Sequence, residues 1–277
     1  MHNIKEIRKN LDFFKKKISE RNSSINFDDL IIFDQDNRVL IQQKEKKEQE
    51  KKILSKSKDS TNFEKSKNLS KEIDEISKKQ IVLQNKISLI LSNIPNIARE
   101  DVPVGVDEKS NKIIKQNGII KKFNFPIKSH VDIGEENSLI DFKTSSKLSG
   151  SRFVILNSYF ALLERALINF MLDIHVQKFS YKEISPPLLV NENVMFGTGQ
   201  LPKFEEDQFE IKLNKDEERK FLIPTAEVVL TNLVRDSVIE SKNLPLRYVA
   251  STPCFRKEAG SYGKDTKGMM RQHQFYK

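Results

Sequence analysis

The chain has 277 residues, of which 37% are hydrophobic and 31% are charged, and its net charge is +9. This length is enough for one large domain or two ordinary ones, and the charge favours a polyanionic partner such as nucleic acid. The single cysteine, Cys254, excludes an internal disulfide and a thiolate metal cluster.

The compartment follows from the same features. A chain with one cysteine is expected in a reducing, cytoplasmic location. The N-terminus has no signal-peptide-like apolar run, and no stretch approaches the length of a membrane span, so no membrane partner is expected. Charge alone still leaves open a membrane surface, or a protein that is merely soluble and rich in lysine.

The N-terminal third predicts helices. Residues 3–20 have apolar spacings of three and four, and a longer helix is expected from Asp28 to about Lys58. Beyond a turn signal at 59–62, a heptad seam continues with one polar interruption, at Leu69, Ile73, Ile76, Gln80, Leu83, Ile87, Ile90 and Ile94. Two such helices predict an antiparallel coiled-coil hairpin, with arms of roughly 45 Å for about 30 residues.

One arm of this hairpin is strongly basic. Between Lys44 and Lys58 there are seven lysines and three glutamates. Such a pattern is usually a solvated helix face; the alternative is an arm that lies along a nucleic-acid backbone and displaces its counterions. The candidate RNA-binding residues are Lys44, Lys46, Lys47, Lys51 and Lys52.

The remaining chain predicts a second, mixed domain. We expect the arm over residues 1–95, a linker and entry to the next domain over 96–137, and that domain over 138–277. A helix with a broad apolar face is predicted from about Asn157 to Phe179, followed by a strand that Pro186 and Pro187 interrupt.

A strand end meets a helix start at Phe221–Glu227. Thr225 is placed to be an N-cap, and Glu227 would lie in the first turn, where the helix dipole favours a carboxylate. Capping alone would explain both residues, without any binding role.

The C-terminal stretch predicts a hairpin that carries charges at spacing two. Arg256 and Glu258 fall on one face of the first strand, and Arg271, His273 and Phe275 share a face of the second. Guanidinium groups fork onto phosphate oxygens, a carboxylate accepts from an exocyclic amine, and an aromatic ring stacks on a base. The hairpin therefore suits a nucleoside triphosphate, although an exposed hairpin with scattered charges would have the same pattern.

Taken together, these motifs resemble a known family. The coiled-coil hairpin, Gly150-Ser-Arg-Phe-Val154, Gly197–Phe204, Leu222–Glu227 and Thr252–Gly263 closely resemble the seryl-tRNA synthetases, which are class II aminoacyl-tRNA synthetases. The resemblance implies an α+β fold, in which the helical arm precedes part of the class II antiparallel β-sheet domain. It runs from the N-terminus to Lys277.

The resemblance implies a reaction and its partners. The family activates serine with ATP and Mg²⁺ to seryl-adenylate, then transfers the seryl group to the 3′ end of tRNA(Ser). It implies a homodimer, with Pro187 as the proline of the dimer motif. It leaves open whether selenocysteine tRNA, tRNA(Sec), is also charged.

It also implies roles for single residues. Arg256, as the catalytic residue, would bridge the serine carboxylate and the α-phosphate, and Thr225 and Glu227 match the serine-binding element. In the ATP site Glu258 would accept from the adenine amine, Phe275 would stack on adenine and Arg271 would lie toward the terminal phosphates. The loop 259–268 would close over the site and meet the tRNA acceptor end, and no residues are assigned to a metal.

The sequence departs from the family pattern at its C-terminal side. The expected third motif, with its ATP-clamping arginine, is absent, so a C-terminally incomplete and inactive synthetase is expected. One alternative is a catalytically inactive, synthetase-like protein that binds tRNA or dimerises. Another is a coiled-coil interaction module with no nucleic-acid role.

Overall fold

The computed structural model describes residues 2–56, 62–212, 218–259 and 268–277. It consists of two compact units, residues 1–118 and residues 119–277. The boundary falls inside the segment that the sequence predicts as a linker, 96–137. Each unit has its own hydrophobic core and is described here by itself.

The first unit is helical. Its helices are α1 (Ile4–Lys9), α2 (Leu11–Ser19), α3 (Phe27–Lys56) and α4 (Asn62–Asn93), with a short 3₁₀ turn, η1 (Glu108–Ser110). The prediction of one continuous helix over 3–20 is wrong, because Asn10 leaves the helical conformation with φ −131° and ψ 44°. Its backbone N–H closes α1 on Glu6 and Ile7, and its carbonyl accepts from Phe14 at the start of α2.

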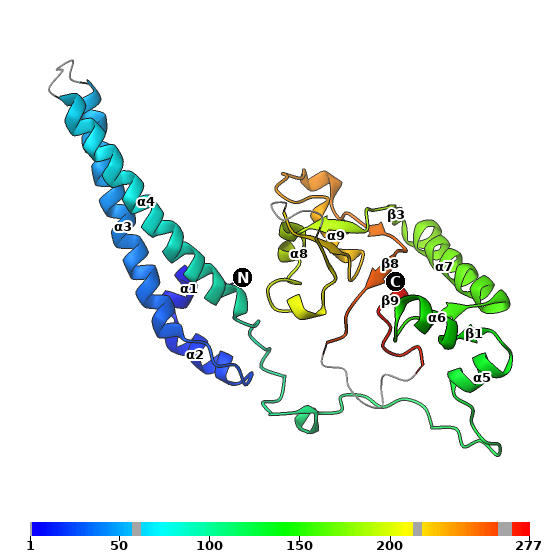
Figure 1. Ribbon diagram of the computed structural model, residues 1–277. Helices are drawn as coiled ribbons and strands as arrows, with labels where there is room; N and C mark the ends of the chain where they lie inside the picture. The colour runs from blue at the N-terminus through cyan, green and yellow to red at the C-terminus, as the bar shows by residue number, and fades with distance from the viewer. Residues whose placement is uncertain (1, 57–61, 213–217, 260–267) are drawn as a thin grey trace. The chain divides into compact units, whose positions relative to one another are not determined.

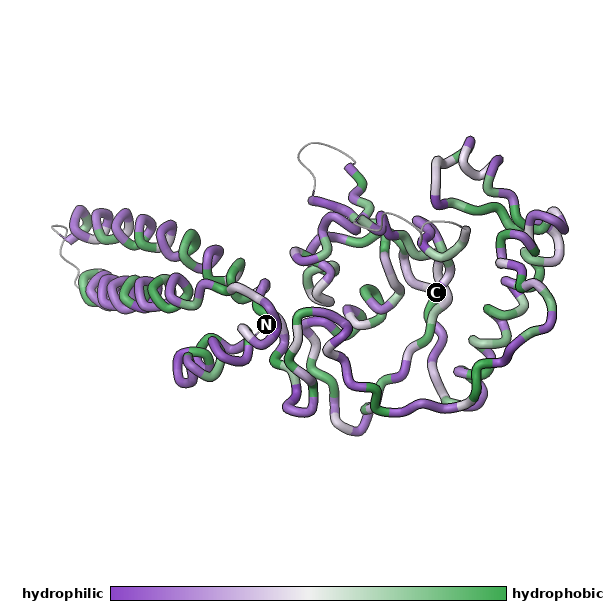
Figure 2. Tube along the Cα trace, turned by 90° about the horizontal axis from the view of Figure 1, so that it is seen from below, coloured by the Kyte–Doolittle hydropathy of each residue, from purple (hydrophilic) through white to green (hydrophobic). Residues whose placement is uncertain are grey.

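The long hairpin is the predicted coiled coil. Helices α3 and α4 run side by side in opposite directions (Figure 1), and hydrophilic and hydrophobic residues alternate along both arms (Figure 2). Ile76, Gln80 and Ile87 of the heptad seam are buried. Most buried apolar residues lie at the base of the hairpin, where α1 and α2 pack against it. They are Ile7, Phe14, Ile18, Phe27, Leu30, Ile87 and Ile94.

The second unit mixes helices with short strands, which confirms the α+β class. Its first half contains α5 (His130–Glu136), β1 (Ile140–Asp141), α6 (Phe142–Ser149), β2 (Ile155–Leu156), α7 (Ser158–Phe179), β3 (Lys182–Glu183), β4 (Leu189–Asn191) and α8 (Glu192–Gly197). Its second half contains η2 (Glu205–Asp207), β5 (Glu210–Ile211), β6 (Lys220–Leu222), α9 (Glu227–Asn232), η3 (Ser241–Asn243), β7 (Tyr248–Val249), β8 (Pro253–Phe255) and β9 (Gln274–Tyr276).

The strands of the second unit pair mostly antiparallel. Over the described residues, β1 pairs with β2, β4–β6–β5 form a three-stranded sheet, and β8 pairs with β9. The pair β3–β7 is parallel, in contrast to the antiparallel pairing of the other strands. The predicted interruption by Pro186 and Pro187 separates β3 from β4, since proline cannot donate a ladder hydrogen bond.

The core of the second unit lies beneath the three-stranded sheet. Its buried members are Val190, Met195, Leu201, Phe221, Ile223, Val228 and Val229. Strand β6 enters this core directly before the Thr225–Glu227 segment. The core therefore fixes the backbone on which the candidate site is built.

Candidate functional site

The C-terminal hairpin, β8 with β9, has a register that puts its ring and one arginine on the same face. Cys254 lies opposite Phe275. The pairing continues one residue further, because the Arg256 N–H donates to the His273 carbonyl at 3.0 Å. Directly opposite residues of an antiparallel pair point to the same face. Cys254, Arg256, His273 and Phe275 therefore share one face.

The side chains agree with this register. The Cζ of Arg256 lies 5.3 Å from the centre of the Phe275 ring. The Arg256 Nε donates to the carbonyl oxygen of Pro224 at 3.3 Å. The prediction that Arg256 and Phe275 face the same side is confirmed. A guanidinium that is held at Nε keeps its two terminal nitrogens for an anion.

Glu258 reaches the same neighbourhood by a different backbone path. Strand β8 ends at Phe255, and Glu258 has a left-handed φ of 49°. The expectation that Glu258 continues the alternation of the strand is therefore wrong. Its Oε2 accepts from the Arg271 Nη1 at 3.1 Å, and 14% of the Glu258 side chain is exposed against 48% for Arg271. Two of the predicted ATP-site residues are thus brought together, with Arg271 on the solvent side.

The Thr225–Glu227 segment lies beside the hairpin. Backbone hydrogen bonds connect Ile223 N to Leu188 O and Phe255 N to Ile223 O, both at 2.9 Å. Thr225 is buried and Glu227 is exposed. Glu227 lies in the first turn of α9, as predicted, but the N-cap position is Ala226 instead of Thr225, and it has no side-chain cap. The Thr225 hydroxyl instead accepts from the Glu227 N–H at 3.4 Å, because the helix starts one residue later than expected.

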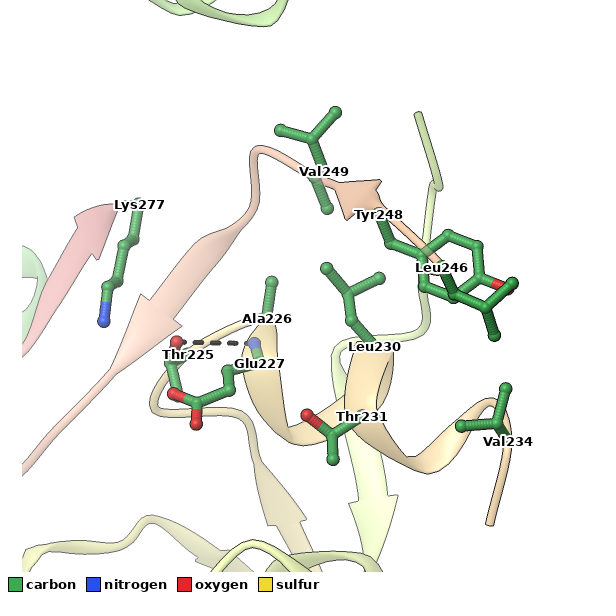
Figure 3. A pocket seen from close by; sticks show the side chains of 11 residues that line it. Thr225, Ala226, Glu227, Leu230, Thr231, Val234, Leu246, Tyr248, Val249 and Lys277 are labelled. Atoms are coloured by element: carbon green, nitrogen blue, oxygen red, sulfur yellow. Dashed lines mark hydrogen bonds between the residues drawn. The ribbon is translucent and has the colours of Figure 1, made fainter. Parts of the chain in front are cut away.

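Thr225, Ala226 and Glu227 line a cavity of about 530 Å³ (Figure 3). Its polar members include Thr225, Glu227 and Lys277, whose side chains lie near one another in the close-up. The opposite wall is mainly apolar and comes from α9 and from the segment around β7. It contains Leu230, Val234, Leu246, Tyr248 and Val249. The cavity can therefore take a small molecule with polar groups at one side and apolar groups at the other.

Sequence reasoning missed three residues that contact this region. Lys277 lines the cavity, and its backbone pairs with Thr252 in both directions at 3.1 Å. Asp207 and Arg152 bond to the chain around Glu258. These two contacts span 52 and 106 residues of sequence, so no local pattern could have indicated them.

An ion-pair cluster supports the turn next to the hairpin. Arg219 contacts Glu192, Glu205 and Glu210, from α8, η2 and β5. The hydrogen bond from Arg219 lowers the pKa of the Glu210 carboxyl, and the reciprocal bond raises the pKa of Arg219. A guanidinium shared by three carboxylates holds three elements in one arrangement.

The predicted RNA-binding lysines all lie on α3, but they differ in exposure. Lys46 and Lys52 are exposed, whereas Lys44, Lys47 and Lys51 are half-buried. Lys47 bonds to Glu72 of α4, and this hydrogen bond raises the pKa of the lysine. Lys47 therefore also fastens the two arms together.

Helix α7 presents the broad apolar face that its sequence predicts, and this face is open. Among its large apolar residues, Tyr159 is 73% exposed, Phe170 61% and Phe179 54%. None of its residues is buried. Pro187, predicted in the dimer motif, is also exposed.

Neither a membrane-spanning helix nor a group of metal-ligating side chains occurs in the part of the chain that the structure describes. Within it, no helix combines the length and apolar character needed to cross a membrane. Over the same residues, no group of three or more His, Cys, Asp or Glu side chains is arranged to hold a metal ion. Most of the predicted loop 259–268 lies outside the described residues, since these omit 260–267.

Two family models match the chain. The model described as the seryl-tRNA synthetase N-terminal domain matches residues 1–98. The model described as the tRNA synthetase class II core domain (G, H, P, S and T) matches residues 208–277. The first match covers the helical hairpin, and the second covers the Thr225–Glu227 segment and the C-terminal hairpin.

Curated relatives match over the whole chain. A serine–tRNA ligase of Pelagibacter ubique (strain HTCC1062) is 57% identical over 277 residues. A serine–tRNA ligase of Wolbachia pipientis subsp. Culex pipiens (strain wPip) is 46% identical over 287 aligned residues. Each alignment covers 100% of this chain and 66% of the relative, so the chain spans slightly less than two thirds of their length.

Solved structures have the same fold. The seryl-tRNA synthetase of Pyrococcus horikoshii, complexed with ATP, matches with a TM-score of 0.80 and 31% identity, over 100% of this chain and 68% of that one. The cytoplasmic serine–tRNA ligase of Naegleria fowleri, in complex with AMP, matches with a TM-score of 0.76 and 25% identity. That match covers 97% of this chain and 62% of the other.

Proposed function

This chain belongs to the seryl-tRNA synthetase family, and from that premise we propose that it binds ATP and serine as part of a serine–tRNA ligase. The observation that carries the proposal is the position of Arg256. Its guanidinium lies over the Phe275 ring, and its Nε is held on Pro224, directly before Thr225. One arginine thus stands between a ring that suits a purine and a cavity that suits a small polar molecule.

The proposed reaction requires little covalent chemistry from the protein. A serine carboxylate oxygen attacks the α-phosphorus of ATP, and the bond to the β-phosphate oxygen breaks, giving seryl-adenylate and pyrophosphate. The 3′-terminal ribose hydroxyl of the tRNA then attacks the seryl carbonyl, and AMP leaves. Both steps need positioning and neutralisation of developing charge.

Arg256 is proposed to do both at the α-phosphate. Its terminal nitrogens can bind one carboxylate oxygen and one phosphate oxygen at the same time, while Nε stays on the Pro224 carbonyl. Phe275 is proposed to stack on adenine, and Glu258 to accept from the adenine amine. Arg271, which is more exposed, is proposed to lie toward the terminal phosphates.

The cavity beside α9 is proposed to hold serine. Thr225 and Glu227 would bind its polar groups, and the apolar wall would limit the size of the side chain. A site that hydrogen-bonds a substrate hydroxyl rejects the analogue without it, since buried polar groups are then left unpaired. Alanine is therefore the expected poor substrate.

Magnesium is proposed to enter with ATP. The described residues contain no group of three or more ligating side chains, so a dedicated protein cage for the ion is not supported there. Mg²⁺ is typically bound through substrate phosphates and waters, with one or two carboxylates. When bound, it would neutralise phosphate charge, while Arg256 and Arg271 act on the other oxygens.

The coiled-coil arm is proposed to bind tRNA(Ser). Lys46 and Lys52 are its exposed candidate contacts, with Lys44, Lys47 and Lys51 beside them. RNA helices are recognised mostly by shape, phosphate and 2′-hydroxyl contacts, which suits lysines on a long helix. The same contacts would accept tRNA(Sec), if that tRNA presents the same shape.

A homodimer through α7 and Pro187 is the proposed assembly, in the cytoplasm. Supporting it, α7 exposes several large apolar residues on a helix without a single buried residue. Exposed apolar patches of this kind mark protein–protein interfaces. A second copy would cover the helix by placing its own α7 or Pro187 region against it.

Binding to the 277-residue chain tests the proposal without requiring turnover. The ligands are ATP and a sulfamoyl analogue of seryl-adenylate, and the variants are Arg256→Lys, Phe275→Ala and the neighbouring control Lys257→Gln. Both site variants should weaken binding at least tenfold, and the control should not. Equal affinity in all four proteins would refute the site.

Serine-dependent ATP–pyrophosphate exchange by the same chain tests turnover. A clear signal would refute the expectation of an inactive chain. Ligand binding without exchange is the expected result, and it agrees both with an incomplete synthetase and with the catalytically inactive, synthetase-like alternative.

A further inference from the structure

Glu258 is held in a backbone conformation that its residue type disfavours. Its φ is 49°, in the left-handed region, where the Cβ of an L-residue crowds the following carbonyl. Such residues persist only where surrounding contacts determine them, and they are common at functional sites. The contacts that hold the backbone of Glu258 therefore indicate which function this conformation supports.

Asp207 binds the chain on both sides of Glu258. The backbone carbonyl of Asp207 accepts from the Lys257 N–H at 2.8 Å. The Asp207 Oδ1 accepts from the Ala259 N–H at 2.7 Å. One residue therefore binds the backbone N–H groups of the residues before and after Glu258. A hydrogen bond from a backbone N–H to a charged carboxylate is stronger than a hydrogen bond between two neutral groups.

Arg152 binds the backbone carbonyl of Glu258 itself. Its Nη1 donates to the Glu258 carbonyl at 3.1 Å. The carbonyl of Arg152 itself accepts from the His273 N–H at 2.9 Å, at the start of the second strand. Arg152 therefore connects Glu258 to the strand that carries Phe275. The backbone of Glu258 is fixed from two separate parts of the chain.

The turn that carries Asp207 is itself anchored. Glu205, two residues before Asp207, bonds to Arg219, which also binds Glu210 and Glu192. Gln208, which directly follows Asp207, is buried, and its Nε2 donates to the Phe204 carbonyl at 2.9 Å. The turn around Asp207 is therefore held in place by several contacts, and the two hydrogen bonds of Asp207 restrict the backbone next to Glu258.

We propose that Asp207 is a positioning residue for Glu258, with Arg152 as its counterpart, and that this pair sets how well the site recognises the amino group of adenine. The inference rests on the proposed role of Glu258 in ATP binding. The bond to Arg271 uses Oε2 of the carboxylate, and the second oxygen can accept from an amine. The direction in which this second oxygen of Glu258 points depends on the backbone conformation that Asp207 and Arg152 hold.

The test compares ATP with purine riboside triphosphate, which lacks the 6-amino group. Dissociation constants for both are measured by calorimetry on the 277-residue chain and on the Glu258→Ala, Asp207→Ala, Asp207→Asn, Arg152→Met and Glu206→Ala variants. The unmodified chain should prefer ATP about tenfold, as expected for a hydrogen bond to a charged acceptor. Thermal melting reports whether each variant folds.

Asp207→Ala and Arg152→Met should reduce the preference to about threefold or less, mainly by weakening ATP. Asp207→Asn, which keeps the Oδ1 acceptor, and Glu206→Ala, an exposed neighbouring carboxylate, should retain it. A full preference in Asp207→Ala and Arg152→Met would overturn the inference, as would equal loss in Asp207→Asn. If Asp207→Ala does not fold, the preference for ATP in Arg152→Met alone decides whether the inference holds.

The inference and the proposed function can fail separately. A full preference in Glu258→Ala, which has no side-chain acceptor, would remove the proposed role of Glu258, and the inference with it. Loss in Glu258→Ala with full preference in the two positioning variants would leave that role and overturn the inference alone. A purely structural role for Asp207 would lower affinity for both nucleotides equally, leave their ratio unchanged and contradict the proposal.

Discussion

Replacing Arg256 by lysine keeps the positive charge and removes the fork. In the structure, Nε is bound to the Pro224 carbonyl at 3.3 Å, and the guanidinium plane lies over the Phe275 ring. A lysine has one ammonium at the end of a flexible stem, so it cannot hold Pro224 and bind two anionic oxygens together. The variant should lose at least one charge-assisted hydrogen bond to ligand.

The expected size of the effect follows from this loss. One hydrogen bond to a charged group contributes about 1.5–3 kcal/mol, which corresponds to roughly 10- to 150-fold in affinity. The loss should be larger for the sulfamoyl analogue of seryl-adenylate than for ATP, because that analogue carries groups on both sides of Arg256. Calorimetric titration of the Arg256→Lys variant with both ligands measures the difference.

Two controls make the experiment decisive. Lys257→Gln removes a neighbouring exposed charge, and it should change either affinity less than threefold. The melting temperature of Arg256→Lys should stay close to that of the unmodified chain, because the side chain is only half-buried. A fold-intact variant with unchanged affinity for both ligands would refute the bridging role.

Three further predictions concern assembly, RNA and pH. Phe170→Glu should convert a dimer to a monomer in sedimentation, whereas Asn169→Glu should not; a monomeric unmodified chain would refute the α7 interface. Replacing the five arm lysines by glutamine should weaken tRNA binding and reduce the slope of log affinity against log salt by roughly 0.7–0.9 per phosphate contact, unlike replacement of the five exposed lysines in 109–122. Because Arg219 lowers the pKa of Glu210 from its ordinary 4.5, that pair should stabilise the fold above about pH 4.5 and lose its contribution as the pH falls through the lowered value. The melting-temperature difference from Glu210→Gln should shrink accordingly, and a difference independent of pH would contradict the pair.

The helical arm could be predicted from sequence because its determinants are local. A heptad seam fixes which residues face the partner helix, and Ile76, Gln80 and Ile87 are buried as their spacing indicates. The break at Asn10 could not be predicted from the same periodicity. The apolar spacing continues through this residue, whereas its backbone does not.

The site was predictable only where strand alternation holds. Arg256 and Phe275 share a face because each lies on, or directly next to, a paired strand. Glu258 lies three residues past the end of β8, and its left-handed conformation follows from contacts with Asp207 and Arg152. Those contacts come from distant parts of the chain, and alternation cannot indicate them.

The backbone explains why the two halves of the site keep their register. Leu188 bonds to Ile223, Ile223 bonds to Phe255, and the next residue, Arg256, bonds to His273. These bonds form a continuous path from β4 across the Thr225 segment to the strand that carries Phe275. A side-chain substitution at Arg256 or Phe275 leaves every bond of this path in place. Such variants should therefore change ligand affinity without moving the cavity beside α9 relative to the C-terminal hairpin, as the proposed direct attack of a carboxylate on a phosphorus atom requires.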